Sequence, residues 1–159
     1  MAGKAKGVDW QWLSKYYPIS ASDLEKQEGV TMTQLVRHCI QKWKGLHPDI
    51  LDYYGLARTR QTQIQRNLLP RTKVLNVNGD SCALCVRFLH KEGNCDGCPL
   101  SIVRGGVSCD DQTQEEKARG QESPYHRFIY GGGKTFAMLK WLRKALTWAR
   151  QQEPKKKKK

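Results

Sequence analysis

The chain has 159 residues, the size of one ordinary domain, and 38% of them are hydrophobic, which is enough for a core. No stretch approaches the ~20 apolar residues that a membrane-spanning helix needs, and the N-terminus lacks the apolar segment of a secretory signal. A membrane partner is therefore not expected. We expect a protein of the cytoplasm, where thiols stay reduced and paired cysteines act as metal ligands more often than as disulfides.

Positive charge is concentrated at the C-terminal end. The formal net charge is +13, and residues 123–159 contain 11 Lys and Arg against one Asp or Glu. Residues 81–122, which hold five of the six cysteines, contain five Lys and Arg against seven Asp and Glu. This distribution favours a polyanion as partner. The basic tail, residues 153–159, is alternatively only a solvated segment, and without its five lysines the net charge is still +8.

Residues 1–73 are predicted to form a helical region. Asp9 is placed to cap a short helix that ends at Pro18, and residues 20–29 contain two overlapping capping-box patterns before a glycine. Three further elements are predicted here and just beyond: a helix over 48–57, a polar helix over 58–69 and a short strand over 72–80.

Residues 31–45 show the clearest helix pattern in the first half of the chain. Apolar residues recur at helical spacing and form one continuous stripe. Cys39 lies on this stripe and is therefore predicted to be a core residue and not a metal ligand, whereas His38 falls on the polar flank. The stripe consists of Met32, Leu35, Val36, Cys39, Ile40 and Trp43.

Residues 20–44 also resemble a helix-turn-helix, because a short helix, a Gly-Val-Thr turn and a longer helix follow one another. Two helices that simply pack through Leu24 and Leu35 would give the same pattern, so both interpretations stay open. In the DNA-reading interpretation, the second helix presents donor-rich side chains to a groove. These side chains are Thr33, Gln34, Arg37, His38 and Gln41.

The segment CALCVRFLHKEGNCDGCPL, residues 82–100, indicates a zinc site. Each Cys-x-x-Cys turn delivers two thiolates to one point, and two turns complete the tetrahedral shell of Zn²⁺. The expected ligands are Cys82, Cys85, Cys95 and Cys98 within a zinc knuckle over residues 74–111. An iron–sulfur cluster and a dithiol redox pair are the alternatives. Cys109 is either an alternate ligand, in place of Cys95 or Cys98, or a free thiol, and His90 is a less suitable substitute.

A site with four thiolates is closed to substrate, so the zinc is expected to be structural. Catalytic zinc keeps one position open for water and usually has His or carboxylate ligands. The segment also lacks the His-x-Glu pattern of zinc deaminases. The four histidines are scattered, and no paired carboxylates share an obvious face. We therefore expect neither an enzyme nor a small-molecule substrate.

The pattern C-x-x-C-x9-C-x-G-C-P-L, followed by a further cysteine, a Pro-Tyr pair and a terminal amphipathic helix, resembles small zinc-knuckle proteins encoded in bacteriophage genomes. The resemblance covers about residues 80–148, and the stretch between Cys109 and Pro124 is longer than expected. These phage proteins mostly have no assigned activity, so the resemblance implies a phage origin and a bacterial host cytoplasm. The matching residues are Cys82, Cys85, Cys95, Gly97, Cys98, Pro99, Leu100, Cys109, Pro124 and Tyr125.

The remaining residues are predicted to form a polar loop over 112–123 and a C-terminal helical segment over 124–152, whose last helix begins near Thr135. The preceding HRFIYGGGKT looks like a strand, a glycine turn and a helix, as in a phosphate-binding loop. The full pattern needs a glycine at position 128, which is Phe128. Nucleotide hydrolysis is therefore disfavoured, although Lys134 at a helix N-terminus could hold a nucleic-acid phosphate.

These features predict a mainly α fold: a small helical domain with an inserted zinc knuckle and a C-terminal amphipathic helix. The expected function is non-catalytic binding of nucleic acid through a basic C-terminal surface. The alternative is a phage inhibitor or adaptor that binds a host protein or an anti-phage defence complex through the aromatic N-terminus and the apolar last helix. The expected nucleic-acid contacts are Lys134, Lys140, Arg143, Lys144, Arg150, Arg37 and His38.

Overall fold

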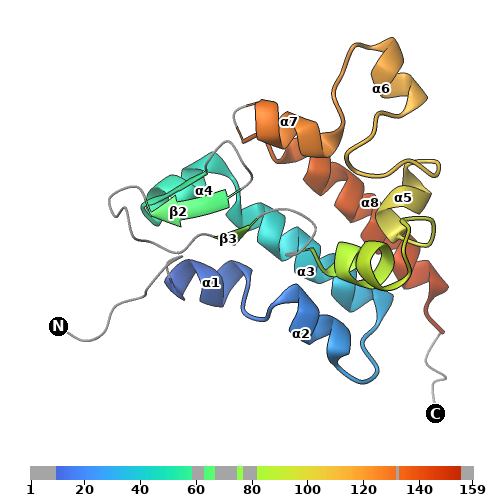
Figure 1. The fold of residues 1–159 in the computed structure, drawn as a ribbon, viewed down its shortest axis with the longest axis horizontal. Coiled ribbons are helices and arrows are strands. Elements are labelled where there is room, and N and C mark those ends of the chain that lie inside the picture. Colours follow the sequence, from blue (N-terminus) through green and yellow to red (C-terminus); the bar gives the residue numbers. More distant parts are fainter. Residues whose placement is uncertain (1–9, 59–62, 67–74, 77–81, 132, 155–159) are drawn as a thin grey trace.

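The computed structural model describes residues 10–58, 63–66, 75–76, 82–131 and 133–154, and its fold is mainly helical, as predicted (Figure 1). Two long helices, α3 and α8, are accompanied by shorter helices and one small sheet. The elements are α1 (Trp10–Tyr16), α2 (Ala21–Lys26), α3 (Met32–Gly45), α4 (Pro48–Tyr53), β1 (Leu56–Arg58), β2 (Gln63–Arg66), β3 (Leu75–Asn76), the π-helix η2 (Cys85–Lys91), α5 (Pro99–Val103), α6 (Gln114–Ala118), α7 (Pro124–Tyr130) and α8 (Phe136–Gln152).

The core is built around α3, which packs against α1, α2, α4 and α8. Helices α3 and α8 lie side by side and run in opposite directions (Figure 1). The predicted apolar stripe of α3 is confirmed, because five of its six side chains are buried and Met32 is partly buried. Each large apolar side chain buried in this way stabilises the fold by about 1.5–3 kcal/mol. The α8 side chains that share this core are Met138, Leu142, Ala145 and Ala149.

Local capping explains where the N-terminal helices begin. Thr31 starts α3 with a complete capping box, in which its hydroxyl accepts from the Gln34 amide at 3.1 Å and the Gln34 side chain accepts from the Thr31 amide. Ser20 caps α2 by accepting from the Asp23 amide. These contacts confirm the first predicted capping pattern of residues 20–29. Asp9, the predicted cap of the first helix, lies outside the described residues.

Helix α1 is fixed to the end of α3 by close contact with Gly45. The indole N–H of Trp12 donates to the Gly45 carbonyl at 2.8 Å. A Cβ at this glycine would lie 2.5 Å from Cγ of Tyr16, so no other residue fits there without moving the tyrosine ring. Trp12, Tyr16 and Tyr17 are all buried. They are core residues, and the prediction that the aromatic N-terminus forms a contact surface is wrong for these three side chains.

A small antiparallel sheet follows α4. Strand β1 pairs with β2, with Leu56 opposite Arg66, and β2 pairs with β3. The polar helix predicted over residues 58–69 is therefore wrong where the structure describes it, because β2 lies within that range. Strand β3 confirms part of the strand predicted over 72–80. Pairing with β1 and β3 overrides the helix preference of the Gln and Arg residues of β2.

His38 is not on an exposed flank, contrary to the prediction. Its side chain is buried, its Nε2 lies 2.7 Å from the Ile19 carbonyl, and its ring centroid is 4.9 Å from that of Tyr17. Thr33 is also buried, and Gln41 donates to the Lys15 carbonyl. The two helices of the helix-turn-helix prediction exist, but the second is the central packing helix. Of its predicted reading face, Arg37, Gln34 and Gln41 are exposed.

The burial of His38 leads to a pH prediction. Burial lowers the pKa of His38, partly opposed by its bond to the Ile19 carbonyl. Below its ordinary pKa of about 6.5, the unfolded chain therefore takes up a proton that the folded chain resists. We expect urea denaturation to give a lower free energy of unfolding at pH 5.5 than at pH 7.5, with a slope of at most about 1.4 kcal/mol per pH unit for this group. His38→Gln should weaken that dependence, and an unchanged slope in the variant would contradict the prediction.

The C-terminal half contains more helix than predicted. Residues 112–123, predicted as a polar loop, include α6, and the HRFIY segment, predicted as a strand, lies in α7. The glycine turn before Lys134 therefore joins two helices. The interpretation of this segment as a strand followed by a phosphate-binding loop is wrong. Helix α8 begins after Thr135, as predicted. None of the helices in the described ranges is long and apolar enough to cross a membrane.

Candidate functional site

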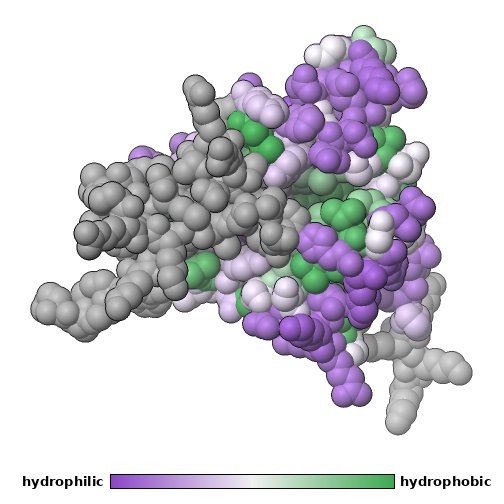
Figure 2. Space-filling model, viewed as in Figure 1, coloured by the Kyte–Doolittle hydropathy of each residue, from purple (hydrophilic) through white to green (hydrophobic). Residues whose placement is uncertain are grey.

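All six cysteines line one cavity of about 240 Å³. Cys39 comes from α3, Cys82 and Cys85 from the start of η2, and the other three from the segments on either side of α5. The remaining wall is largely apolar and includes Leu89, Leu100, Tyr125, Met138 and Leu142. Figure 2 shows hydrophobic side chains at the surface between the hydrophilic regions on the right of the molecule.

The first Cys-x-x-Cys pair is formed by a tight turn at the start of η2. The Val86 amide donates to the Cys82 carbonyl at 2.9 Å and so starts the turn. Glu25 of α2 holds η2 in place, because its carboxylate accepts from Arg87 at 2.8 Å and from Lys91 at 3.0 Å. These contacts place both sulfurs of the pair against the core.

The second pair is shaped by the Gly-Cys-Pro-Leu motif. The Cys98 amide donates to the Cys95 carbonyl at 3.1 Å, which closes the turn. A Cβ on Gly97 would lie 3.1 Å from the Phe88 ring, so glycine allows the turn to sit close against η2. Cys98 caps α5, with a proline at the first helical position. The Ile102 amide donates to the Cys98 carbonyl at 2.9 Å and closes the first turn of that helix.

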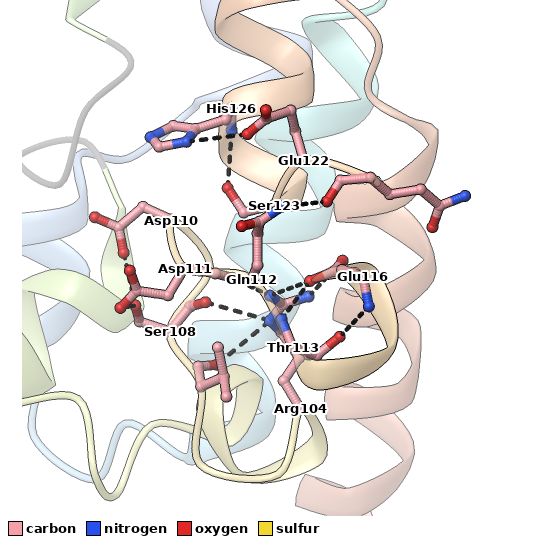
Figure 3. Close-up of polar contacts among 12 residues, drawn as sticks. Arg104, Ser108, Asp110, Asp111, Gln112, Thr113, Glu116, Glu122, Ser123 and His126 are labelled. Atoms are coloured by element: carbon pink, nitrogen blue, oxygen red, sulfur yellow. Dashed lines mark hydrogen bonds and ion pairs between the residues drawn. The ribbon is translucent and has the colours of Figure 1, made fainter. Parts of the chain in front are cut away.

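Cys109 belongs to a loop that a buried arginine holds in place (Figure 3). Arg104, 3% exposed, donates to the carbonyls of Val107, Ser108 and Asp111 and forms an ion pair with Glu116 at 2.9 Å. The Cys109 carbonyl in turn accepts from the Tyr125 amide of α7 at 3.1 Å. The long stretch between Cys109 and Pro124 is therefore packed onto the domain through α6.

Two residues of this cavity were missed by the sequence prediction of the site. Cys39 was predicted as a core residue, and it is buried, but its sulfur also lies 3.7 Å from the sulfur of Cys82. Lys42 is only 1% exposed and lines the same cavity. A signal was available in the sequence, because Lys42 lies seven residues after Leu35 and three after Cys39. A lysine on the apolar face of a core helix is rare unless its charge has a partner.

The cavity stabilises a thiolate at Cys82. Hydrogen bonds from Cys39 and Cys85, together with the charge of Lys42, lower the pKa of Cys82 well below its ordinary value. Hydrogen bonding to Cys82 and burial raise the pKa of both Cys39 and Cys85. Burial raises the pKa of Cys98 to about 12 and also raises those of Cys95 and Cys109. The Cys82 thiolate contributes to all five of these increases, so every other cysteine lies within its electrostatic range.

The donors of this cavity fit zinc in their chemistry. They are all sulfur, and they line one cavity whose remaining wall is largely apolar. Zn–S bonds of ~2.3 Å give a tetrahedral sulfur–sulfur edge of about 3.8 Å, close to the 3.7 Å between Cys39 and Cys82. In the described part of the chain, no three His, Cys, Asp or Glu side chains are yet close enough to hold an ion. Small rotations of the cysteine side chains would be needed to bring four sulfurs to bonding distance of one ion.

The predicted ligands Cys82, Cys85, Cys95 and Cys98 and the alternate Cys109 thus reach one cavity. His90 is exposed and is not part of its wall.

The predicted nucleic-acid contacts are placed mostly on one face of α8. Lys140, Arg143, Lys144 and Arg150 are all exposed, and α8 contains no Asp or Glu. Lys144 lies over the Trp141 ring, with 4.6 Å between Nζ and the ring centroid. Three further candidates lie outside this helix: Lys134 and Arg37 are exposed, whereas His38 is buried and cannot contribute to a surface contact.

No protein-family model, curated protein or solved structure matches this chain. The resemblance to phage zinc-knuckle proteins therefore stays a prediction that rests on the cysteine pattern.

Proposed function

We propose that this protein is a non-catalytic, zinc-stabilised protein that binds nucleic acid through the exposed face of α8. The observation that carries the proposal is the basic face of that helix, formed by Lys140, Arg143, Lys144 and Arg150 without an acidic residue. Such a face neutralises backbone phosphates and gives sequence-independent affinity. Lys134, at the start of the helix, extends the same basic region.

The zinc would support this face without touching the nucleic acid. Met138 and Leu142, on the opposite side of α8, line the cysteine cavity. A metal bound there would hold the knuckle against the buried side of the helix and leave the basic side in water. The proposal therefore joins a structural Zn²⁺ and a binding surface through one helix. Cys82, Cys85, Cys95 and Cys98 are the expected ligands, with Cys109 as the alternate, and phage origin and a host cytoplasm remain part of the proposal.

Inhibition of a host protein or a defence complex is a second candidate. It is supported by two exposed aromatic side chains on either side of the turn before α8: Tyr130 is 79% exposed and Phe136 is 75% exposed. Exposed aromatics of this kind are common anchors in protein interfaces. The other surfaces expected for this function are less favourable, because Trp12, Tyr16 and most of the apolar side chains of α8 are buried or partly buried.

The test is the salt dependence of binding to a labelled duplex DNA and a labelled single-stranded RNA, measured by fluorescence anisotropy. The test variant changes Lys140, Arg143 and Lys144 to Gln. The control variant changes Lys26, Lys44 and Lys117, which are also exposed but lie on other helices, and therefore has the same net charge.

We expect the test variant to reduce the slope of log K against log salt by roughly 2–3 on DNA, since each phosphate contact contributes about 0.9. The control should keep nearly the wild-type slope. Equal losses in both variants would mean that only net charge matters, and failure of the wild type to bind either nucleic acid would reject the proposal.

A further inference from the structure

The position of Cys39 goes beyond the ligand set expected from the two Cys-x-x-Cys pairs. We propose that Cys39 is itself a metal ligand, which together with Cys82 binds a thiophilic divalent ion such as Zn²⁺ and so joins α3 directly to the knuckle. This inference rests on the zinc site of the proposed function. It changes the role of the metal, because the ion would then bridge two parts of the chain that are far apart in the sequence.

The distance between the two sulfurs is the first reason. Cys39 and Cys82 are 43 residues apart, yet their sulfurs are separated by 3.7 Å. This separation suits two ligands of one tetrahedral ion, for which the edge is about 3.8 Å. It is far longer than the ~2.05 Å of a disulfide bond, and both cysteines are free thiols. Cys85 lies three residues after Cys82 and lines the same cavity, so a third sulfur is available to the same ion.

The surroundings of the Cys39 sulfur are the second reason. Cys39 is only 1% exposed, and its side chain lines the same cavity as the other five cysteines. Leu84, which lies between the two cysteines of the first pair, lines this cavity as well. The Cys39 sulfur therefore faces the knuckle, where a core cysteine that only fills space would have no need of sulfur neighbours.

The buried charge of Lys42 is the third reason. A divalent ion with four thiolates has a net charge of −2, and burial of such a group is costly unless a cation lies near it. Lys42, one turn after Cys39, is only 1% exposed and lines the same cavity as the cysteines. The ligand shell would then comprise Cys39, Cys82 and Cys85, with the fourth position filled by one of the three later cysteines.

The test is Co²⁺ substitution in the full chain, followed by absorption spectroscopy and measurement of metal affinity. Cobalt reports its ligands through the intensity of the sulfur-to-metal charge-transfer band and the position of the visible bands. Cys39→Ala is the test variant. Val36→Ala is the matched control, because Val36 is also fully buried on α3 and its truncation perturbs the core without removing a sulfur.

We expect the wild type to bind one Co²⁺ with the spectrum of four thiolates. Cys39→Ala should lose about a quarter of the charge-transfer intensity and bind cobalt at least 10-fold more weakly, whereas Val36→Ala should keep the wild-type spectrum. An unchanged four-thiolate spectrum in Cys39→Ala would overturn the role of Cys39 and leave the zinc site intact. Absence of cobalt binding by the wild type would reject the metal site itself, so the two failures are distinguishable.

If Cys39→Ala proves too unstable to titrate, Cys39→Ser keeps the volume of the site and weakens the ligand. The readout is then the increase in melting temperature caused by Zn²⁺. A markedly smaller increase in Cys39→Ser than in Val36→Ala supports the proposal, and equal increases overturn it.

Discussion

Replacing Glu116 with alanine is expected to lower the free energy of unfolding by about 3–5 kcal/mol, the usual effect of removing one partner of a buried ion pair. Glu116 is 5% exposed and Arg104 is 3% exposed, and their side chains meet through two hydrogen bonds of 2.9 and 3.3 Å. Without the carboxylate, the guanidinium would remain buried without its counter-charge (Figure 3). Urea denaturation followed by circular dichroism measures the change.

Glu115→Ala is the matched control for this prediction. Glu115 is the neighbouring residue of the same helix, and it pairs with Arg119 at 2.9 Å on the surface, where both side chains are more than half exposed. Such a pair contributes at most about 1 kcal/mol. Similar losses in the two variants would show that the buried pair has no special role.

The pair between Glu116 and Arg104 should also be sensitive to acid. Burial alone would raise the pKa of Glu116, but hydrogen bonds from Arg104 and Thr113 lower it overall. The stabilisation is therefore fully present above the ordinary carboxyl range and is lost as the pH falls through the lowered value. Protonation of His38 affects stability at a higher pH than protonation of Glu116, so the two effects can be separated in one pH series.

Removal of the metal is the second change for which we expect a large effect. Chelation should lower stability by about 4 kcal/mol when the reference sample contains free Zn²⁺ at a thousand times its Kd. The loss follows because the metal binds the folded cavity and not the unfolded chain. Differential scanning calorimetry with and without a chelator gives the shift in melting temperature, and hydrogen exchange should show the largest gain around residues 82–111.

The control for chelation is the same chelator saturated with Zn²⁺ beforehand, which should leave the melting temperature unchanged. An identical melting curve in free and saturated chelator would show that the protein holds no stabilising metal. Cys82→Ser should reproduce the effect of chelation, because Cys82 belongs to the first pair and its sulfur lies 3.7 Å from that of Cys39.

Periodicity predicted α3 and α8 well, because both helices are long and their apolar residues recur at helical spacing. The error at His38 has a physical reason. The stripe predicts one buried face, but α3 is packed on more than one side, so Tyr17 and Ile19 cover a flank that the pattern assigns to water. For a helix that packs against several neighbours, the apolar periodicity therefore does not predict which polar side chains are exposed.

The candidate metal site was partly predictable for a related reason. Local spacing predicts Cys82, Cys85, Cys95 and Cys98 as ligands, since each pair is completed within four residues. Cys39 carries no such spacing, and only the packing of α3 against the knuckle brings its sulfur to Cys82. The folded structure of residues 105–123 was not predicted, because it depends on the buried charge of Arg104. The partner of this charge, Glu116, is 12 residues away.

The pairing of α3 with α8 also has a consequence for synthesis of the protein. The partner of α3 is the last helix of the described chain, so about 90 residues separate the two halves of the main core. A nascent chain on the ribosome therefore exposes the apolar stripe of α3 until α8 has emerged, and folding with such distant contacts is comparatively slow. A premature stop codon before Phe136 would leave that stripe permanently uncovered, and the truncated product would be a substrate for cellular proteases.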